Sequence, residues 1–310
     1  MGAEMNYYIC AHQHKGRPYH RALRAAGHKP YSREADVALF DRDWFMHDDT
    51  KPRRQVIDFL DQGAMIMIYP HSALPPWWYD GLIKIQPYVK CVFVIGEGQK
   101  EAMRIIEPSV HVETTGWPWC PQKPFRKPWV FKKLLFAPIH PAGGKLRPEA
   151  FRANQAIFHD LKRVQSRTGC DVIVRYIGDL KQQGLHPYTR FEWIRGKPDG
   201  KTKEIDAADV VVAEGTYMYL AVARGKPTIG INQHVPVRAN KMSDIYCPHH
   251  WNRYGVRLAY PINYEPGKLS KLIEAAMSGE QTEWRERLIG DTMDQNAFAA
   301  AVERIWREKR

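Results

Sequence analysis

The residues with the clearest chemical meaning form the turn Glu214-Gly215-Thr216, which follows an apolar run and precedes a helical pattern. Glycine permits a tight turn and a close approach of the backbone to a ligand. We expect Thr216 to cap the helix with its hydroxyl, so that the amides of Thr216, Tyr217 and Met218 face an anion such as a diphosphate. The Glu214 carboxylate is placed to accept hydrogen bonds from ribose hydroxyls. The alternative is an ordinary strand–turn–helix unit with a threonine cap.

A second candidate anion site lies in the stretch FAPIHPAGGKLR, after the apolar run Lys133–Ala137. Gly143 and Gly144 allow the backbone to approach a phosphate, and Lys145 adds positive charge. His140 is a candidate contact to the same diphosphate. The spacing of a Walker P-loop and its GK[ST] ending are absent. The alternative is a plain surface loop.

Imidazole and carboxylate groups that follow apolar runs in the first half are the candidate general bases. His12 and His14 lie in the stretch AHQHKGRP, and imidazole suits proton transfer near neutral pH. The loops after the strands of an open α/β sheet lie at its carboxyl end, where ligands bind. The alternative is that both histidines are solvated loop residues. The rival bases are Asp41, Asp43, His71, and Glu97 in the turn Gly96-Glu97-Gly98.

Two further sets of aromatic and basic side chains could bind a substrate. We interpret the first set as contacts to an acceptor, the molecule that receives a transferred group, namely His71, Trp77, Trp78, Lys15 and Arg17. The second set lies in or beside the proline-rich linker of residues 116–128, namely Trp117, Trp119, Trp129, Lys123, Arg126 and Lys127. Cations bind phosphates, and flat rings stack on bases or on sugars. Packing in the core is the alternative for such rings.

Two short sequence patterns could indicate a metal-binding site. Cys247, His249 and His250 fall within four residues, which is too crowded to surround one zinc ion tetrahedrally. The triplet Asp41-Arg42-Asp43 reads DxD, a pattern in which two carboxylates can hold a metal ion, but the two-domain layout described below and the stretch Glu214–Pro227 outweigh it. The five cysteines are scattered without a CxxC pair, which is typical of a reducing compartment. We therefore expect no metal, no disulfide framework and a cytoplasmic protein.

Short apolar runs alternate with helical stretches along the whole chain, which predicts parallel sheets covered by helices. Predicted strands and helices of the first half end with a strand at Val110–Thr114, and the pattern restarts at Lys133–Ala137. The sequence thus predicts two α/β domains, residues 1–128 and 129–290, followed by a C-terminal helical segment, residues 291–310. We expect that segment to return to the first domain.

The amino-acid composition, above all its charge, indicates which kinds of molecule the protein could bind. The chain has 310 residues, 44% of them hydrophobic and 26% charged, which is ordinary for globular proteins. Its 46 lysines and arginines exceed its 34 acids, giving a formal charge of +12. Such an excess favours a polyanionic partner, namely nucleic acid, an anionic membrane surface or a phosphorylated ligand. Apolar runs are too short to span a membrane, so no integral membrane association is expected.

The stretch Ala208–Asn232 resembles the donor-binding region of glycosyltransferases with two Rossmann-like domains facing a cleft, the GT-B fold. In that family a strand "aDvvv" precedes a small-residue turn, a helix of the form "sxxEAxaxGkP" and a strand "PtI". The corresponding parts here are Ala208–Ala213, Glu214–Thr216, Tyr217–Pro227 and Thr228–Ile231. Tyr219-Leu220 stands where many members place Glu-Ala. Either Glu214 therefore substitutes for the usual ribose-binding glutamate, or the ribose is held otherwise.

The resemblance implies a metal-independent glycosyltransferase that moves a sugar from a nucleotide-sugar donor, UDP-linked and with no further cofactor, to an acceptor hydroxyl. Small DNA-modifying enzymes of bacterial viruses share the fold. Together with the positive charge, this makes a hydroxymethylated base in double-stranded DNA the expected acceptor. The donor residues are then Glu214, Gly215, Thr216 and Tyr217 with the loop of Gly143.

Three alternatives remain open at this point. The first is a glycosyltransferase or glycerophosphotransferase that acts on a cell-surface glycan or polymer. The second is a sugar-nucleotide epimerase of the same fold. The third is of another class, a nucleic-acid-binding or nucleotide-binding protein without catalysis.

Overall fold

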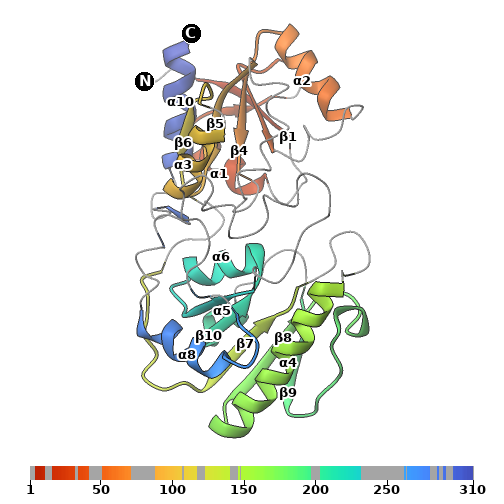
Figure 1. Ribbon diagram of the computed structural model, residues 1–310. Helices are drawn as coiled ribbons and strands as arrows, with labels where there is room; N and C mark the ends of the chain where they lie inside the picture. The colour runs from red at the N-terminus through yellow and green to blue at the C-terminus, as the bar shows by residue number, and fades with distance from the viewer. Residues whose placement is uncertain are drawn as a thin grey trace. The chain divides into compact units, whose positions relative to one another are not determined.

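The computed structural model divides into two compact units, Met1–Pro121 with Glu286–Arg310 (unit 1) and Gln122–Arg285 (unit 2) (Figure 1). The residues that the structure describes are 4–10, 16–31, 34–41, 51–70, 88–106, 108–116, 123–139, 146, 148–196, 203–231, 262, 264–279, 285, 289–290 and 296–309. The sequence-based boundary at residue 128 falls inside unit 2, and the last 25 residues of the chain belong to unit 1.

Unit 1 is built on a parallel sheet with the strand order β2-β1-β3-β4-β5-β6. Its strands are β1 (Asn6–Cys10), β2 (Lys29–Pro30), β3 (Val37–Asp41), β4 (Met65–Tyr69), β5 (Val89–Val94) and β6 (Val112–Thr114). Its helices are α1 (Arg17–Ala25), α2 (Lys51–Asp61), α3 (Glu97–Ile106) and α10 (Ala297–Lys309).

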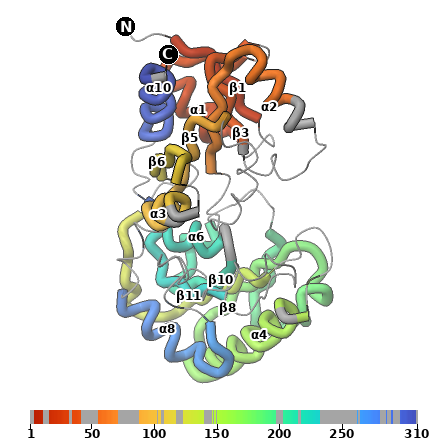
Figure 2. The backbone as a smooth tube through the Cα atoms, turned by 45° about the horizontal axis from the view of Figure 1, so that its top comes forward, coloured from red at the N-terminus to blue at the C-terminus, as the bar shows by residue number. Residues whose placement is uncertain are grey.

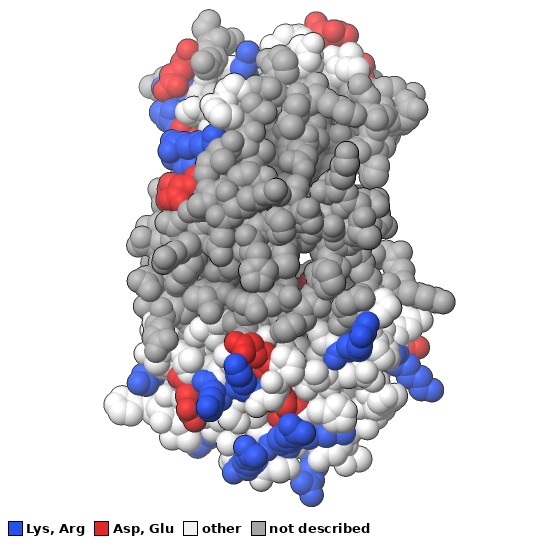
Figure 3. Space-filling view, in the orientation of Figure 1, with Lys and Arg blue, Asp and Glu red and all other residues white. Residues whose placement is uncertain are grey.

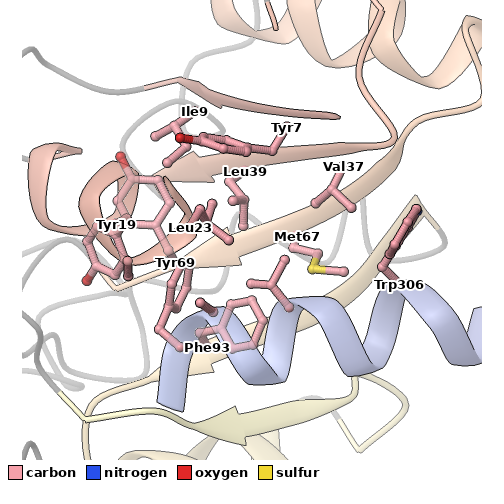
Figure 4. Close-up of a cluster of buried hydrophobic side chains, with 14 of the residues drawn as sticks. Tyr7, Ile9, Tyr19, Leu23, Val37, Leu39, Met67, Tyr69, Phe93 and Trp306 are labelled. Carbon is pink, nitrogen blue, oxygen red and sulfur yellow. The ribbon is translucent and has the colours of Figure 1, made fainter. Parts of the chain in front are cut away.

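Side chains alternate between the two faces of this sheet, and each face has its own core. Tyr7 and Leu39 pack on the face that α1 and α10 cover, in a cluster that includes Phe298 and Trp306. Figure 4 shows Met67, Phe93 and Trp306 gathered at α10. The opposite face packs against α2 and α3 through Val56 and Met103. The helices therefore bury the sheet on both sides, as the near-continuous apolar strands require.

The C-terminal helix completes the core on one face of the unit 1 sheet. The Phe298 ring lies 4.7 Å from that of Tyr19 and 5.1 Å from that of Phe93, centroid to centroid. A guanidinium nitrogen of Arg304 lies 2.9 Å from a carboxylate oxygen of Glu113 on the edge strand β6. In Figure 2 the blue α10 lies beside the red elements near the start of the chain, and α10 contacts α1. Sequentially distant segments thus form one hydrophobic core.

Unit 2 is a second parallel sheet, with the order β11-β10-β7-β8-β9. Its strands are β7 (Lys133–Ala137), β8 (Asp171–Tyr176), β9 (Phe191–Arg195), β10 (Val210–Ala213) and β11 (Thr228–Gly230). Its helices are α4 (Pro148–Thr168), η4 (Lys181–Gln183), α5 (Lys203–Ala207), α6 (Gly215–Ala223) and α8 (Leu269–Ser278).

The strand order in unit 2 reverses between the neighbouring strands β7 and β10. From β7 the chain passes through α4 to β8 on one side, and from β10 it passes through α6 to β11 on the other. Right-handed crossovers in opposite directions place α4 and α6 on opposite faces. The segments that follow β7 and β10 therefore leave the sheet side by side at its carboxyl edge. Such a switch point is where open α/β sheets bind ligands.

Unit 1 has a corresponding reversal between β1 and β3. The chain passes from β1 through α1 to β2 on one side, whereas β4, β5 and β6 follow β3 on the other. Cys10 at the end of β1 pairs with Phe40 of β3. The candidate bases His12 and His14 follow β1 in the sequence, and the candidate base Asp41 is the last residue of β3.

The predicted fold class is confirmed, because both sheets contain only parallel pairs. The strands and helices expected from the apolar patterns are present with shifts of a few residues at their ends. Strand β2 and the short helices η4 and α5 were not predicted. Their sequences are too short, or in β2 too polar, to produce an apolar period.

Candidate active site at the switch point of unit 2

The turn from β10 into α6 is the centre of the candidate site. All four residues of β10 are buried, and α6 begins at Gly215, with Glu214 as its N-cap residue in an extended conformation (φ −111°, ψ 156°). The prediction that Thr216 caps the helix is therefore wrong, because Thr216 already lies in its first turn. The Met218 amide donates to the Glu214 carbonyl at 3.3 Å, so it is not one of the open amides that we expected. Helix geometry leaves the amides of Gly215, Thr216 and Tyr217 without partners inside the helix.

Glu214 lies at this turn in a partly buried position, and its carboxylate makes no capping hydrogen bond to α6. Burial raises the pKa of Glu214 from its ordinary 4.5 to about 7. Burial likewise raises the pKa of Tyr219 on α6 to about 12. A carboxyl group with a pKa near neutrality can donate or accept a hydrogen bond near physiological pH, which suits contact with a sugar or ribose hydroxyl.

A buried arginine extends the site across the sheet, and sequence reasoning did not identify it. Arg175 lies near the end of β8 and is only 5% exposed. Its guanidinium carbon lies 4.6 Å from the centroid of the Tyr217 ring. Because β7 separates β8 from β10 in the sheet, this contact joins the ends of two strands that are not neighbours. It brings a positive charge to the first turn of α6.

Gly196 leaves the space that the Arg175 guanidinium occupies. The Gly196 amide donates to the Tyr176 carbonyl at 2.8 Å, directly after β9. A Cβ at this position would lie 2.5 Å from the guanidinium carbon of Arg175. A larger residue at position 196 would therefore displace this guanidinium, so the glycine makes room for Arg175 in its observed position.

Tyr217 and Glu204 add two further polar groups. The Tyr217 hydroxyl is buried and makes no hydrogen bond with any described residue. Burial raises the pKa of the Tyr217 hydroxyl. The positive charge of Arg175 opposes this shift, and the negative charge of Glu204 adds to it. The Oε2 atom of Glu204, on α5, is also buried and has no hydrogen-bond partner in the described part of the chain. The site therefore combines a guanidinium, a phenol and two carboxyl groups at one helix N-terminus.

Asn154 holds the start of the second candidate loop. This fully buried residue of α4 accepts from the Ile139 amide at 2.9 Å and donates to the Ile139 carbonyl at 2.9 Å. Its amide nitrogen also donates to the Gln183 carbonyl at 3.0 Å, in the segment after β8. One side-chain amide thus fixes both the last described residue after β7 and the connection from β8. Asn154 is a positioning residue that the sequence analysis missed.

The other predicted site residues fall into three groups. Glu97 is the first residue of α3, not part of a turn, and its exposed carboxylate lies 3.9 Å from the Lys100 ammonium. Arg17 is the first residue of α1 and is exposed, and Asp41 ends β3, with its side chain outside the described set. Entirely outside the described residues are His12, His14, Lys15, Asp43, His71, Trp77, Trp78, His140, Gly143, Gly144 and Lys145. Their predicted roles stay predictions.

No metal site and no membrane span are found in the part of the chain that the structure describes. Within it, no three His, Cys, Asp or Glu side chains gather in a way that could hold a metal ion. None of its helices combines the length and the apolar character needed to span a bilayer. The residues of the two patterns examined for metal binding, Asp41 to Asp43 and Cys247 to His250, have side chains outside the described set.

Solved structures share the two-unit architecture. A putative UDP-N-acetylglucosamine 2-epimerase from Listeria monocytogenes is 13% identical, covers 99% of this chain and 98% of its own, and gives a TM-score of 0.59. A UDP-N-acetylglucosamine 2-epimerase from Rickettsia bellii is 8% identical over 98% of this chain and 97% of its own, with a TM-score of 0.56. A glycosyltransferase from Rickettsia africae is 10% identical over 99% of both chains, with a TM-score of 0.51.

These similarities confirm the GT-B fold that the Ala208–Asn232 stretch predicted. At such low identity they show the fold and not the activity. No family model matches the sequence, and no curated protein matches it either.

Replacing Asn154 by leucine tests whether it fixes the two loops. Leucine has the same branched shape as asparagine but no hydrogen-bonding groups, so the buried Ile139 amide and carbonyl lose their partner and we expect the free energy of unfolding to fall by roughly 2–5 kcal/mol. Urea denaturation followed by circular dichroism measures the change. His159→Leu, on the exposed side of α4, is the matched control and should change it by less than about 0.5 kcal/mol. Equal stability of the two variants would contradict the assignment.

The raised pKa of Glu214 makes stability depend on pH. The folded protein keeps a proton that the unfolded chain releases, so the free energy of unfolding falls as the pH rises from about 4.5 to about 7. Glu214→Gln cannot become charged. We expect it to be more stable than wild type above pH 7, by on the order of 1–3 kcal/mol, with the difference shrinking towards pH 4.5.

Thermal denaturation across this pH range, for the wild type and for the variant, checks the expectation. The control is Glu192→Gln, which changes an exposed carboxylate on β9 of the same unit. A constant difference between wild type and Glu214→Gln at every pH would show that Glu214 titrates normally.

Proposed function

We propose that the protein is a metal-independent glycosyltransferase that moves a sugar from a nucleotide-sugar donor, UDP-linked, to an acceptor hydroxyl. The observation that carries the proposal is the buried Arg175 guanidinium stacked on Tyr217 at the N-terminus of α6, at the strand-order reversal of unit 2. The GT-B fold supports it, since structures with this fold include a glycosyltransferase and two enzymes named for a UDP-sugar.

The donor diphosphate fits the first turn of α6. Open backbone amides and the helix dipole favour an anion there, and Arg175 supplies the cation. These groups would stabilise the negative charge that develops on the departing nucleotide, which is the part of the reaction that a metal would otherwise assist. Glu214, half-buried beside them, is the proposed contact to a ribose or sugar hydroxyl.

The acceptor side is assigned to unit 1. Sugar transfer needs a base to take the proton of the attacking hydroxyl; His12 and His14 follow β1 in the sequence, and Asp41 is the last residue of the neighbouring strand β3. Their position after the strand-order reversal is the counterpart of the donor site in unit 2. Glu97 is a weaker base candidate, because its carboxylate is 55% exposed and lies beside Lys100.

A pair of substitutions at Thr216 tests donor binding. Thr216→Asp places a negative charge in the first turn of α6, where it favours the helix but repels a diphosphate. We expect UDP affinity, measured by isothermal titration calorimetry, to fall by more than about tenfold. Thr216→Asn has a similar shape without the charge and should lose less than about threefold. Unchanged UDP affinity in Thr216→Asp would remove this assignment.

A 2-epimerase acting on a UDP-sugar is the second candidate. Two such enzymes match with higher TM-scores than the glycosyltransferase does. The two reactions differ in one requirement, since an epimerase converts the nucleotide sugar without an acceptor. Incubation with UDP-N-acetylglucosamine alone, followed by proton NMR, would give a new nucleotide sugar only from an epimerase.

The acceptor that we propose is a hydroxymethylated base in double-stranded DNA, which rests on the charge of +12 and on the resemblance in fold. A glycan or cell-surface polymer is the alternative acceptor. Hydroxymethylated DNA incubated with a panel of nucleotide sugars and EDTA should gain the mass of one sugar per modified base. Unmodified DNA is the control, and a gain on a glycan but not on DNA would contradict the DNA acceptor.

A further inference from the structure

Two adjacent apolar side chains protrude from unit 2 with no role in the proposed site. Trp129 is 101% exposed and Val130 is 59% exposed. Among the large hydrophobic residues that the structure describes, these two are the most exposed. Single exposed apolar residues are common on protein surfaces. A fully exposed tryptophan next to an exposed valine is an apolar projection, which points to a binding surface.

The segment that carries them, residues 126–132, is fixed at both ends. The Arg126 amide donates to the Gly225 carbonyl at 3.1 Å. At the other end, the amides of Lys132 and Lys133 both donate to Oδ2 of Asp209, at 2.9 Å and 2.8 Å. Trp129 therefore stands on an anchored turn and not on a loose tail, so little conformational entropy is lost when it binds.

Cations outnumber acids around the turn, where Asp209 and Asp171 are the acidic residues that it contacts. Residues 126–132 contain three exposed cations, Arg126, Lys127 and Lys132, and no acid. The Lys132 carbonyl accepts from the Asp171 amide at 2.8 Å, which places the turn beside the end of α4. Two more exposed arginines, Arg163 and Arg167, lie in the last turns of that helix. Figure 3 shows several lysine and arginine side chains, with some acidic side chains among them, on the lower part of unit 2.

We propose that residues 126–132 dock unit 2 onto an anionic lipid surface. Tryptophan is favoured at the boundary between headgroups and acyl chains, because its ring is apolar and its indole N–H is polar. Valine gains free energy by entering the same layer. The three cations flank these side chains and match the negative headgroups, so the turn joins an apolar contact to an electrostatic one.

The exposed valine favours a lipid surface over a nucleic acid. Bases offer flat faces on which a tryptophan ring stacks, and cations bind phosphates equally well in both cases. An aliphatic side chain beside the ring adds little on a nucleic acid. At a membrane it adds buried apolar area.

The docking turn leaves the proposed donor site accessible. It lies just before Lys133, at the amino end of β7, whereas Glu214 and α6 follow the carboxyl end of the neighbouring parallel strand β10. In a parallel sheet these ends lie at opposite edges. Lipid docking therefore goes beyond the proposed sugar transfer and is independent of it.

Vesicle co-sedimentation of the full chain tests the proposal. Wild type should bind vesicles of phosphatidylcholine with phosphatidylglycerol, and bind phosphatidylcholine alone weakly. Trp129→Ser should lower the partition coefficient by about tenfold. Lys127→Gln and Lys132→Gln should each lower it by about fivefold at low salt and by less at high salt.

Matched controls separate the turn from general effects. Tyr88→Ser removes another exposed aromatic, and Lys271→Gln removes an exposed lysine on α8; both should bind as wild type does. Melting temperature and UDP affinity should be unchanged in Trp129→Ser, so that loss of lipid binding and failure of the donor site remain distinguishable.

Four results would overturn the proposal. The first is no binding of wild type to anionic vesicles, and the second is equal binding by Trp129→Ser and wild type. The third is loss of binding to a short DNA duplex in Trp129→Ser with vesicle binding unchanged, which would make the turn a nucleic-acid contact. The fourth is conversion of a dimer to a monomer by Trp129→Ser in size-exclusion chromatography, which would make the turn a contact between copies of this chain.

Discussion

The reversal of strand order is the constraint on which the candidate site depends. Parallel strands linked by right-handed crossovers must bury both faces under helices, so the strand edges are the places left for chemistry. Only where two neighbouring strands send their chains to opposite faces do their loops separate and open a space. In unit 2 this occurs between β7 and β10, and in unit 1 between β1 and β3. The strand order therefore places the candidate residues at the carboxyl edges of the two sheets, and individual contacts only refine their positions.

A few buried or half-buried polar residues provide the chemical groups of the candidate site in unit 2. Arg175 reaches Tyr217 from a strand that is not adjacent, and the absence of a side chain at Gly196 makes room for it. Asn154 ties the segments after β7 and β8 together with one amide group. Burial brings the pKa of Glu214 close to 7. The Arg175 guanidinium, the N-terminus of α6 and the Glu214 carboxyl group therefore lie together at the carboxyl edge of this sheet.

The sequence predicted the elements well because buried parallel strands are short apolar runs and the covering helices have a clear period. It also predicted that a strand turns into a helix at Glu214, and α6 begins directly after this residue. It placed the helix start wrongly, because Ser, Thr and Asp are the usual caps and the extended residue here is Glu214. Arg175 and Asn154 were missed, since nothing local shows what a polar residue inside an apolar pattern contacts. Their position in DVIVRYI and on the buried stripe of α4 was the available signal.

The central claim is that a nucleoside diphosphate binds where β10 turns into α6. Hydrogen–deuterium exchange followed by mass spectrometry, with and without UDP, tests it on the unmodified protein. The account predicts slower exchange in the peptides that span the first turn of α6 and the segment after β7, because bound phosphate oxygens would accept from those amides. Protection confined to unit 1, or no protection at saturating UDP, would contradict it.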